Sequence, residues 1–212
     1  VSKFGYNPSI SSIAFETIWE GSNAYPWQTV ADQLEVLSSS ANDTSAGTGA
    51  RTVELQGLDS SWNLLTETVI MNGTNAVTTT GLFLRIFRAR VVTAGSDLIN
   101  AGNITIRDQD TSTTRAIITN SVGKSMGQSL MAIYTVPAGK TAYLKNVNFS
   151  SGKDLEQEYR LMARDNTVTN AAWNVKEFIT GRGGFGDLDK FAINKYTEKT
   201  DLDLQALSSA TS

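Results

Sequence analysis

Paired carboxylates are the side chains of this sequence that could catalyse a reaction by acid–base chemistry. Three pairs are separated by a single residue: Glu156 with Glu158, Asp187 with Asp189, and Asp201 with Asp203. On a strand this spacing places both carboxylates on one face, where they could act as the acid and base of a glycoside hydrolase. Such pairs far more often belong to a solvated outer face of a sheet, and we expect that role here.

The 212 residues include no His and no Cys. This excludes the Ser-His-Asp triad, imidazole proton transfer, thiolate nucleophiles, disulfides and zinc clusters. We therefore predict that the protein is not an enzyme, and we expect no catalytic residue, no metal site and no cofactor.

Charge also limits the partners. Eighteen basic and 21 acidic residues give a formal net charge of −3, so the chain has no basic excess to neutralise a phosphate backbone, and we expect no nucleic-acid partner. No stretch approaches the ~18 consecutive apolar residues that span a bilayer, and residues 1–8 lack the pattern of a secretion signal. The sequence predicts a soluble protein without a membrane partner.

Short alternating segments indicate an all-β protein. Residues 51–58 and 65–71 alternate around a turn and predict a hairpin, residues 103–108 and 114–118 predict a second, and residues 130–149 predict a third around Pro137-Ala-Gly139. The Asn72-Gly73 turn predicts that residues 76–80 pair back onto the preceding strand. No window sustains a helical period, so we expect an antiparallel, jelly-roll-like β-sandwich at residues 30–212, with a possible further boundary near residue 165.

Residues 1–29 show no steady period and predict an extended N-terminal arm. Isolated large apolar side chains in such an arm are buried either on its own body or on a neighbouring subunit. If the arm binds a partner, the expected anchors are its aromatic residues Phe4, Tyr6, Phe15, Trp19, Tyr25 and Trp27. A different aromatic, Trp62, lies in a predicted turn and could contact a glycan, although core packing or a subunit contact is the more frequent role of such a residue.

Six long segments of the sequence are more specific than the alternation: Ser2–Pro8, Ser38–Ser60, Thr66–Thr74, Phe87–Ser96, Asn100–Ile106 and Tyr134–Leu144. They resemble a family of structural proteins from tailed bacteriophages, especially marine and cyanobacterial ones, and the resemblance spans roughly residues 2–165. Beyond about Asp165 the sequence departs from the family pattern. The resemblance implies an oligomeric virion component that is assembled in the bacterial cytoplasm, and it transfers no catalytic residue.

Together these observations predict a capsid decoration, or cement, protein on the capsid surface of the virion. Its expected partners are the major capsid protein and neighbouring copies of itself. The alternatives are a tail or fibre component that binds host surface glycans, and a head-to-tail connector subunit.

Overall fold

The computed structural model describes residues 1–120 and 127–209; the side chains of residues 152–154 and 183–193 lie outside this description. Twelve strands follow one another along the chain: β1 (Glu16–Thr17), β2 (Leu34–Ser38), β3 (Ala50–Leu58), β4 (Leu64–Ile70), β5 (Val77–Thr78), β6 (Arg85–Ala94), β7 (Ile104–Asp108), β8 (Thr114–Ile118), β9 (Ile133–Thr135), β10 (Ala142–Asp165), β11 (Asn174–Tyr196) and β12 (Thr200–Ser208). The described residues contain no helix, and all the strand pairs between them are antiparallel. The predicted all-β antiparallel class is confirmed.

The chain divides into two compact units, each built from separate stretches of sequence. Unit 1 comprises residues 1–6 and 25–131, and unit 2 comprises residues 7–24 and 132–212. This division differs from the expected arm at 1–29 and body at 30–212, because residues 1–29 are shared between both units. Residue 165 is the last residue of β10 and lies inside unit 2, so the structure places no boundary there.

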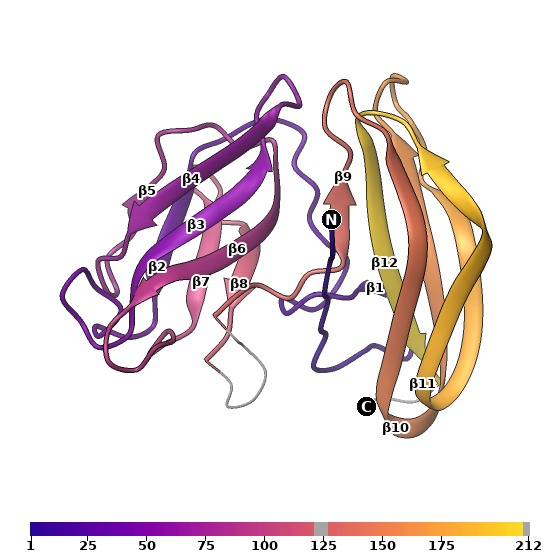
Figure 1. The fold of residues 1–212 in the computed structure, drawn as a ribbon, viewed down its shortest axis with the longest axis horizontal. Coiled ribbons are helices and arrows are strands. Elements are labelled where there is room, and N and C mark those ends of the chain that lie inside the picture. Colours follow the sequence, from indigo (N-terminus) through magenta and orange to yellow (C-terminus); the bar gives the residue numbers. More distant parts are fainter. Residues whose placement is uncertain (121–126, 210–212) are drawn as a thin grey trace. The chain divides into compact units, whose positions relative to one another are not determined.

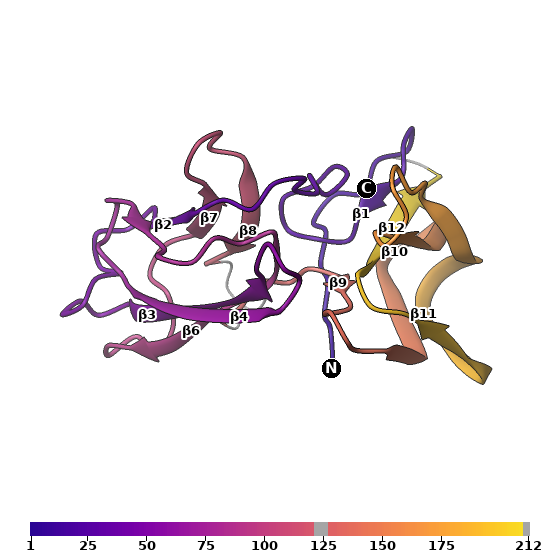
Figure 2. The same ribbon diagram turned by 90° about the horizontal axis from the view of Figure 1, so that it is seen from above.

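Unit 1 is a β-sandwich of two sheets. Figure 2 shows β2, β7 and β8 in one layer and β3, β4 and β6 in the other. Alternation along each strand turns apolar side chains into the space between the layers: Leu34, Val36, Val53, Leu55, Ile104 and Ile106 are fully buried. The predicted hairpins formed by β3 with β4 and by β7 with β8 are both present.

Unit 2 is built around one long hairpin. β10 and β11 run side by side as long curved strands (Figure 1), and β12 pairs with the second half of β10. The two halves of the hairpin pack on each other, because the rings of Phe149 and Tyr159 lie 4.3 Å apart and Tyr196 joins Leu161 and Ala163 in one apolar cluster. The inward side chains of β10 therefore form the core of this unit.

Two predicted pairings are wrong. The Pro137–Gly139 turn forms, with Gly139 at φ 67°, but β9 pairs with β12 rather than with β10. Likewise β5 pairs with β2, not with the strand that precedes the Asn72-Gly73 turn. Local turn chemistry places the bends correctly in both cases, whereas partner choice depends on which distant strand completes a buried face.

Candidate functional site

Exposed apolar side chains gather on one face of the β10–β11 hairpin. Along β10 the odd-numbered residues Tyr159, Leu161 and Ala163 are buried, so the even-numbered residues point to the opposite face. Pairing with β11 places Phe178 beside Arg160 and Val175 beside Met162. The side chains of Phe178 and Val175 are 55% and 50% exposed. We name this surface the β10–β11 outer face and define it by Phe15, Arg160, Met162, Arg164, Trp173, Val175 and Phe178.

One end of the outer face is organised around Arg160. The guanidinium carbon lies 3.9 Å from the centre of the Phe15 ring, and its Nε donates a hydrogen bond of 2.8 Å to Gln205. Phe15 in turn meets Phe178 edge-on, with ring centres 6.3 Å apart. Burial lowers the pKa of Arg160 and the charge of Asp203 partly opposes that shift. The result is an arginine held between a polar partner and an aromatic ring.

The other end is organised around Arg164. Its guanidinium carbon lies 4.6 Å from the centre of the Trp173 ring, and its Nη2 is 2.7 Å from Oδ2 of Asp201. Asp201 is fully buried and also accepts hydrogen bonds from Thr135 at 2.6 Å and from Asn166 at 2.8 Å. These contacts fix the orientation of Arg164 before any partner binds. Preorganised arginine and aromatic side chains are typical of the residues that contribute most to protein interfaces.

The carboxylate pair Asp201 and Asp203 does not lie on a solvated face, so that interpretation is wrong for these residues. Both side chains are buried, and Asp203 accepts hydrogen bonds from Thr17 at 3.1 Å and from Gln205 at 2.8 Å. Each carboxylate therefore joins separate strands of unit 2 to one another. Glu156 is exposed and Glu158 is partly exposed, as expected, whereas the side chains of Asp187 and Asp189 lie outside the described residues.

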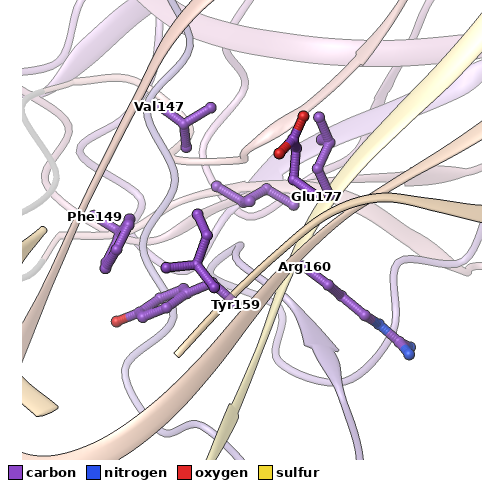
Figure 3. Close-up of a pocket in the computed structure, with 8 residues that line it drawn as sticks. Val147, Phe149, Tyr159, Arg160 and Glu177 are labelled. Atoms are coloured by element: carbon purple, nitrogen blue, oxygen red, sulfur yellow. The ribbon is translucent and has the colours of Figure 1, made fainter. Parts of the chain in front are cut away.

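A cavity on the opposite, inner face of the hairpin is too small for an organic ligand. Its volume is about 10 Å³, and its lining includes Val147, Phe149, Tyr159, Leu161 and Ile179. Figure 3 shows the rings of Phe149 and Tyr159 close together at one side, while the guanidinium of Arg160 points away from the cavity. The cavity is a packing gap in the core of unit 2.

The six expected arm anchors fall into three environments. Trp19 and Tyr25 are buried, 4% and 5% exposed, and each donates a hydrogen bond to a backbone carbonyl of its own unit. Tyr6, Phe15 and Trp27 are partly buried, and Phe4 is 60% exposed. Of the six, only Phe15 belongs to the outer face. The aromatic side chains of residues 1–29 thus find much of their burial within this chain.

Trp62 lies at the turn between β3 and β4, as expected, in a backbone conformation with φ 65°. Asp59 forms this turn by accepting hydrogen bonds from the backbone N–H groups of Ser61 and Asn63 at 2.8 and 2.9 Å. The Trp62 ring is partly buried, and its centre lies 4.9 Å from the guanidinium carbon of the buried residue Arg85. Trp62 is therefore held in place by a core residue of unit 1.

The sequence alone does not identify four residues of the outer face as site residues, namely Arg160, Arg164, Trp173 and Phe178. The alternation of residues 159–164 contains a usable signal, because it assigns both arginines to the outward face. It contains no signal that Phe15, 145 positions earlier in the chain than Arg160, completes that face. That contact depends on β1 pairing with β12.

Comparison of the sequence with protein-family models and with curated proteins, and of the structure with solved structures, gives no match. Within residues 1–120 and 127–209 no helix has the length and hydropathy needed to cross a membrane. The described side chains also contain no group of three or more acidic residues placed to hold a metal ion.

Proposed function

We propose that this chain is a non-enzymatic structural protein of a tailed-bacteriophage virion, and specifically a decoration protein that binds and stabilises the capsid shell. The observation that carries the binding role is the β10–β11 outer face, where fixed arginines and exposed apolar side chains lie together. The resemblance of residues 2–165 to phage structural proteins supplies the kind of particle. The major capsid protein and neighbouring copies of this chain are the proposed partners.

The composition of the outer face favours a protein partner. Aromatic, methionine and arginine side chains are enriched at protein interfaces, and a stable interface buries about 1,200–2,000 Å² in total. The rings of Phe15 and Trp173 already restrict the two arginines, so binding would lose little side-chain entropy there. The outer face would form the centre of such an interface, with Lys176 and Glu158 at its polar rim.

The first experiment counts the copies of this chain in purified virions by quantitative mass spectrometry against the major capsid protein. Copy number follows from particle symmetry. A ratio on the order of one chain per shell subunit supports a decoration protein. A few to a few tens of copies would instead support a tail, fibre or connector component, and absence from the virion would refute the whole proposal.

A second experiment tests the surface. Phe178→Asp places a charge at the centre of the outer face. The substitution leaves the core of unit 2 unchanged, because the Phe178 side chain is more than half exposed. We expect this variant to stay folded and to lose binding to undecorated capsids. Leu98→Asp is the matched control, since Leu98 is 86% exposed and lies in unit 1. If Phe178→Asp binds undecorated capsids as tightly as Leu98→Asp and the wild-type protein do, the outer face is excluded as the capsid-binding surface.

The geometry of Trp62 favours one alternative function, the binding of host surface glycans by a tail or fibre protein. A rigid aromatic ring at a polar turn suits stacking against a sugar. This alternative predicts that the isolated protein binds polysaccharide and that Trp62→Ala abolishes the binding while Trp62→Phe retains part of it. Failure of the wild-type protein to bind cells or polysaccharide would exclude this function.

A further inference from the structure

β4 is an open edge of its sheet in unit 1. The strands of this sheet follow in the order β4, β3 and β6, and Figure 1 shows β4 on the outside. At the opposite edge a short segment pairs with β6, since Val91 donates to Gly127 at 2.7 Å and Ser129 donates to Ala89 at 2.8 Å. In the part of the chain that the structure describes, β4 pairs with β3 alone. One row of its backbone groups can therefore accept another strand.

The hydrogen bonds at the two ends of β4 show which backbone groups form this row. The Asp59 N–H donates to Asn63 at 3.0 Å, and the Met71 N–H donates to Arg51 at 2.9 Å. Bonded residues alternate along an antiparallel pair, so the odd-numbered residues of β4 use their N–H and C=O groups on β3. The even-numbered residues turn theirs to the open edge: Leu64, Thr66, Thr68 and Ile70.

The same four residues carry exposed side chains on the outer surface of the sheet. Leu64 and Ile70 are 64% and 62% exposed, and the two threonines between them are also exposed. Natural edge strands are often protected by a lysine, a proline or a β-bulge. The sequence of β4, Leu-Leu-Thr-Glu-Thr-Val-Ile, contains neither residue, and its pairing with β3 has no register shift. This composition favours the addition of a strand.

The sequence of β4 is chemically symmetric about its central residue, Glu67. When two copies of β4 run antiparallel and are centred on Glu67, each apolar residue meets an apolar one and each threonine meets a threonine: Leu64 with Ile70, Leu65 with Val69, and Thr66 with Thr68. Apolar and threonine cross-strand pairs both stabilise a sheet. In this register all four residues that face the open edge bond to one another across the axis.

The charge of Glu67 at the centre of this arrangement is partly offset within each chain. An inward-pointing charge on an edge strand ordinarily opposes pairing. The Glu67 carboxylate, however, accepts hydrogen bonds from the backbone N–H groups of Thr80 and Gly81, both at 2.8 Å. Donation by two N–H groups stabilises the carboxylate, so the repulsion between two copies of Glu67 is weakened.

We propose that β4 pairs with β4 of a second copy of this chain around a twofold axis at Glu67. The two three-stranded sheets then join into one continuous antiparallel sheet. This pairing goes beyond the proposed function, because it lies in unit 1 and needs no capsid, whereas the proposed capsid-binding surface lies in unit 2. Seven residues a side are fewer than the ~20–30 of a standard interface, so the dimer is weak and depends on concentration.

Amide hydrogen exchange of the wild-type protein without capsids, at about 10 µM and about 1 mM, tests the pairing. Where a dimer prevails, its monomer fraction falls as the inverse square root of the total concentration, so protection can rise by up to about tenfold over this range. We expect a rise of about three- to tenfold at the amides of the four even-numbered residues of β4. The amides of Leu65, Glu67 and Val69 should not change, because they already bond to β3.

A variant at Thr68 tests the backbone bonds directly by sedimentation velocity. Thr68→Pro removes an N–H that faces the open edge and leaves the bonds to β3 in place, so it should abolish the dimer. Thr68→Val is the matched control, because valine keeps both the N–H and the β-branched shape, and it should keep the dimer.

The exchange measurement on the wild-type protein decides the question even if Thr68→Pro fails to fold. Protection of β4 that does not change with concentration would overturn the proposal, as would a dimer that protects β11 instead. Protection of the even-numbered amides only after capsids are added would assign the edge to a strand of another protein, and it would equally exclude pairing between copies.

Discussion

Removal of the Asp43 carboxylate should strongly destabilise unit 1. Asp43 is fully buried in the connection between β2 and β3 and accepts four hydrogen bonds. Oδ1 accepts from the N–H groups of Ala50 and Ala101 at 2.6 and 2.8 Å, and Oδ2 accepts from Ser38 and the Gly102 N–H at 2.5 and 2.9 Å. A single side chain therefore joins three separate segments.

The expected magnitude follows from the donors left behind. Asp43→Ala leaves three backbone N–H groups without their acceptor, and at about 2 kcal/mol for each group we expect a loss of about 6 kcal/mol. Asp43→Asn keeps the Oδ1 position but presents an NH₂ group to the Gly102 N–H, and we expect about 2–3 kcal/mol. At about 2–4 °C per kcal/mol, the Ala variant should melt about 12–24 °C lower.

Urea unfolding followed by circular dichroism measures the loss, and amide exchange at Ala50, Ala101 and Gly102 localises it to unit 1. Asp97→Ala is the control, because Asp97 is an exposed acidic residue of the same unit. If Asp43→Ala lowers the free energy of unfolding no more than Asp97→Ala does, then Asp43 does not organise these segments and the reasoning is wrong.

Two further predictions concern backbone packing and pH. Gly57→Ala should destabilise unit 1 by about 3 kcal/mol or more in urea unfolding, because its Cβ would lie 1.9 Å from the backbone oxygen of Arg85. Gly139→Ala, with no atom within 4 Å but φ 67°, should cost only about 1 kcal/mol, and similar losses would contradict this argument. Burial raises the pKa of Tyr134, Tyr159 and Tyr196 above 10, so unit 2 should lose stability as pH rises past 10, and absorbance titration should find these three tyrosines ionising late. Normal titration of all six tyrosines in the folded protein would exclude this effect.

The sequence by itself determined that the fold is all-β and on which face of a strand many of the side chains lie. Alternation along the sequence places Val53 and Leu55 on one face of their strand and Ile104 and Ile106 on one face of theirs, and all four are fully buried. This succeeds because a strand turns successive side chains to opposite faces wherever it lies in the fold. The β3–β4 hairpin was predictable for a related reason, since its partner strand follows after a short turn.

Tertiary structure decided which distant strands pair and what the irregular segments do. β9 lies beside β12, which begins 65 residues after β9 ends. The connection between β2 and β3, at residues 39–49, shows no regular period in the sequence and is fixed by the hydrogen bonds of Asp43. Alternation assigns a residue to one face of a strand, but it does not identify the segment of the protein that packs on that face. The contact between Arg160 and the Phe15 ring therefore depends on the tertiary structure and cannot be read from the alternation.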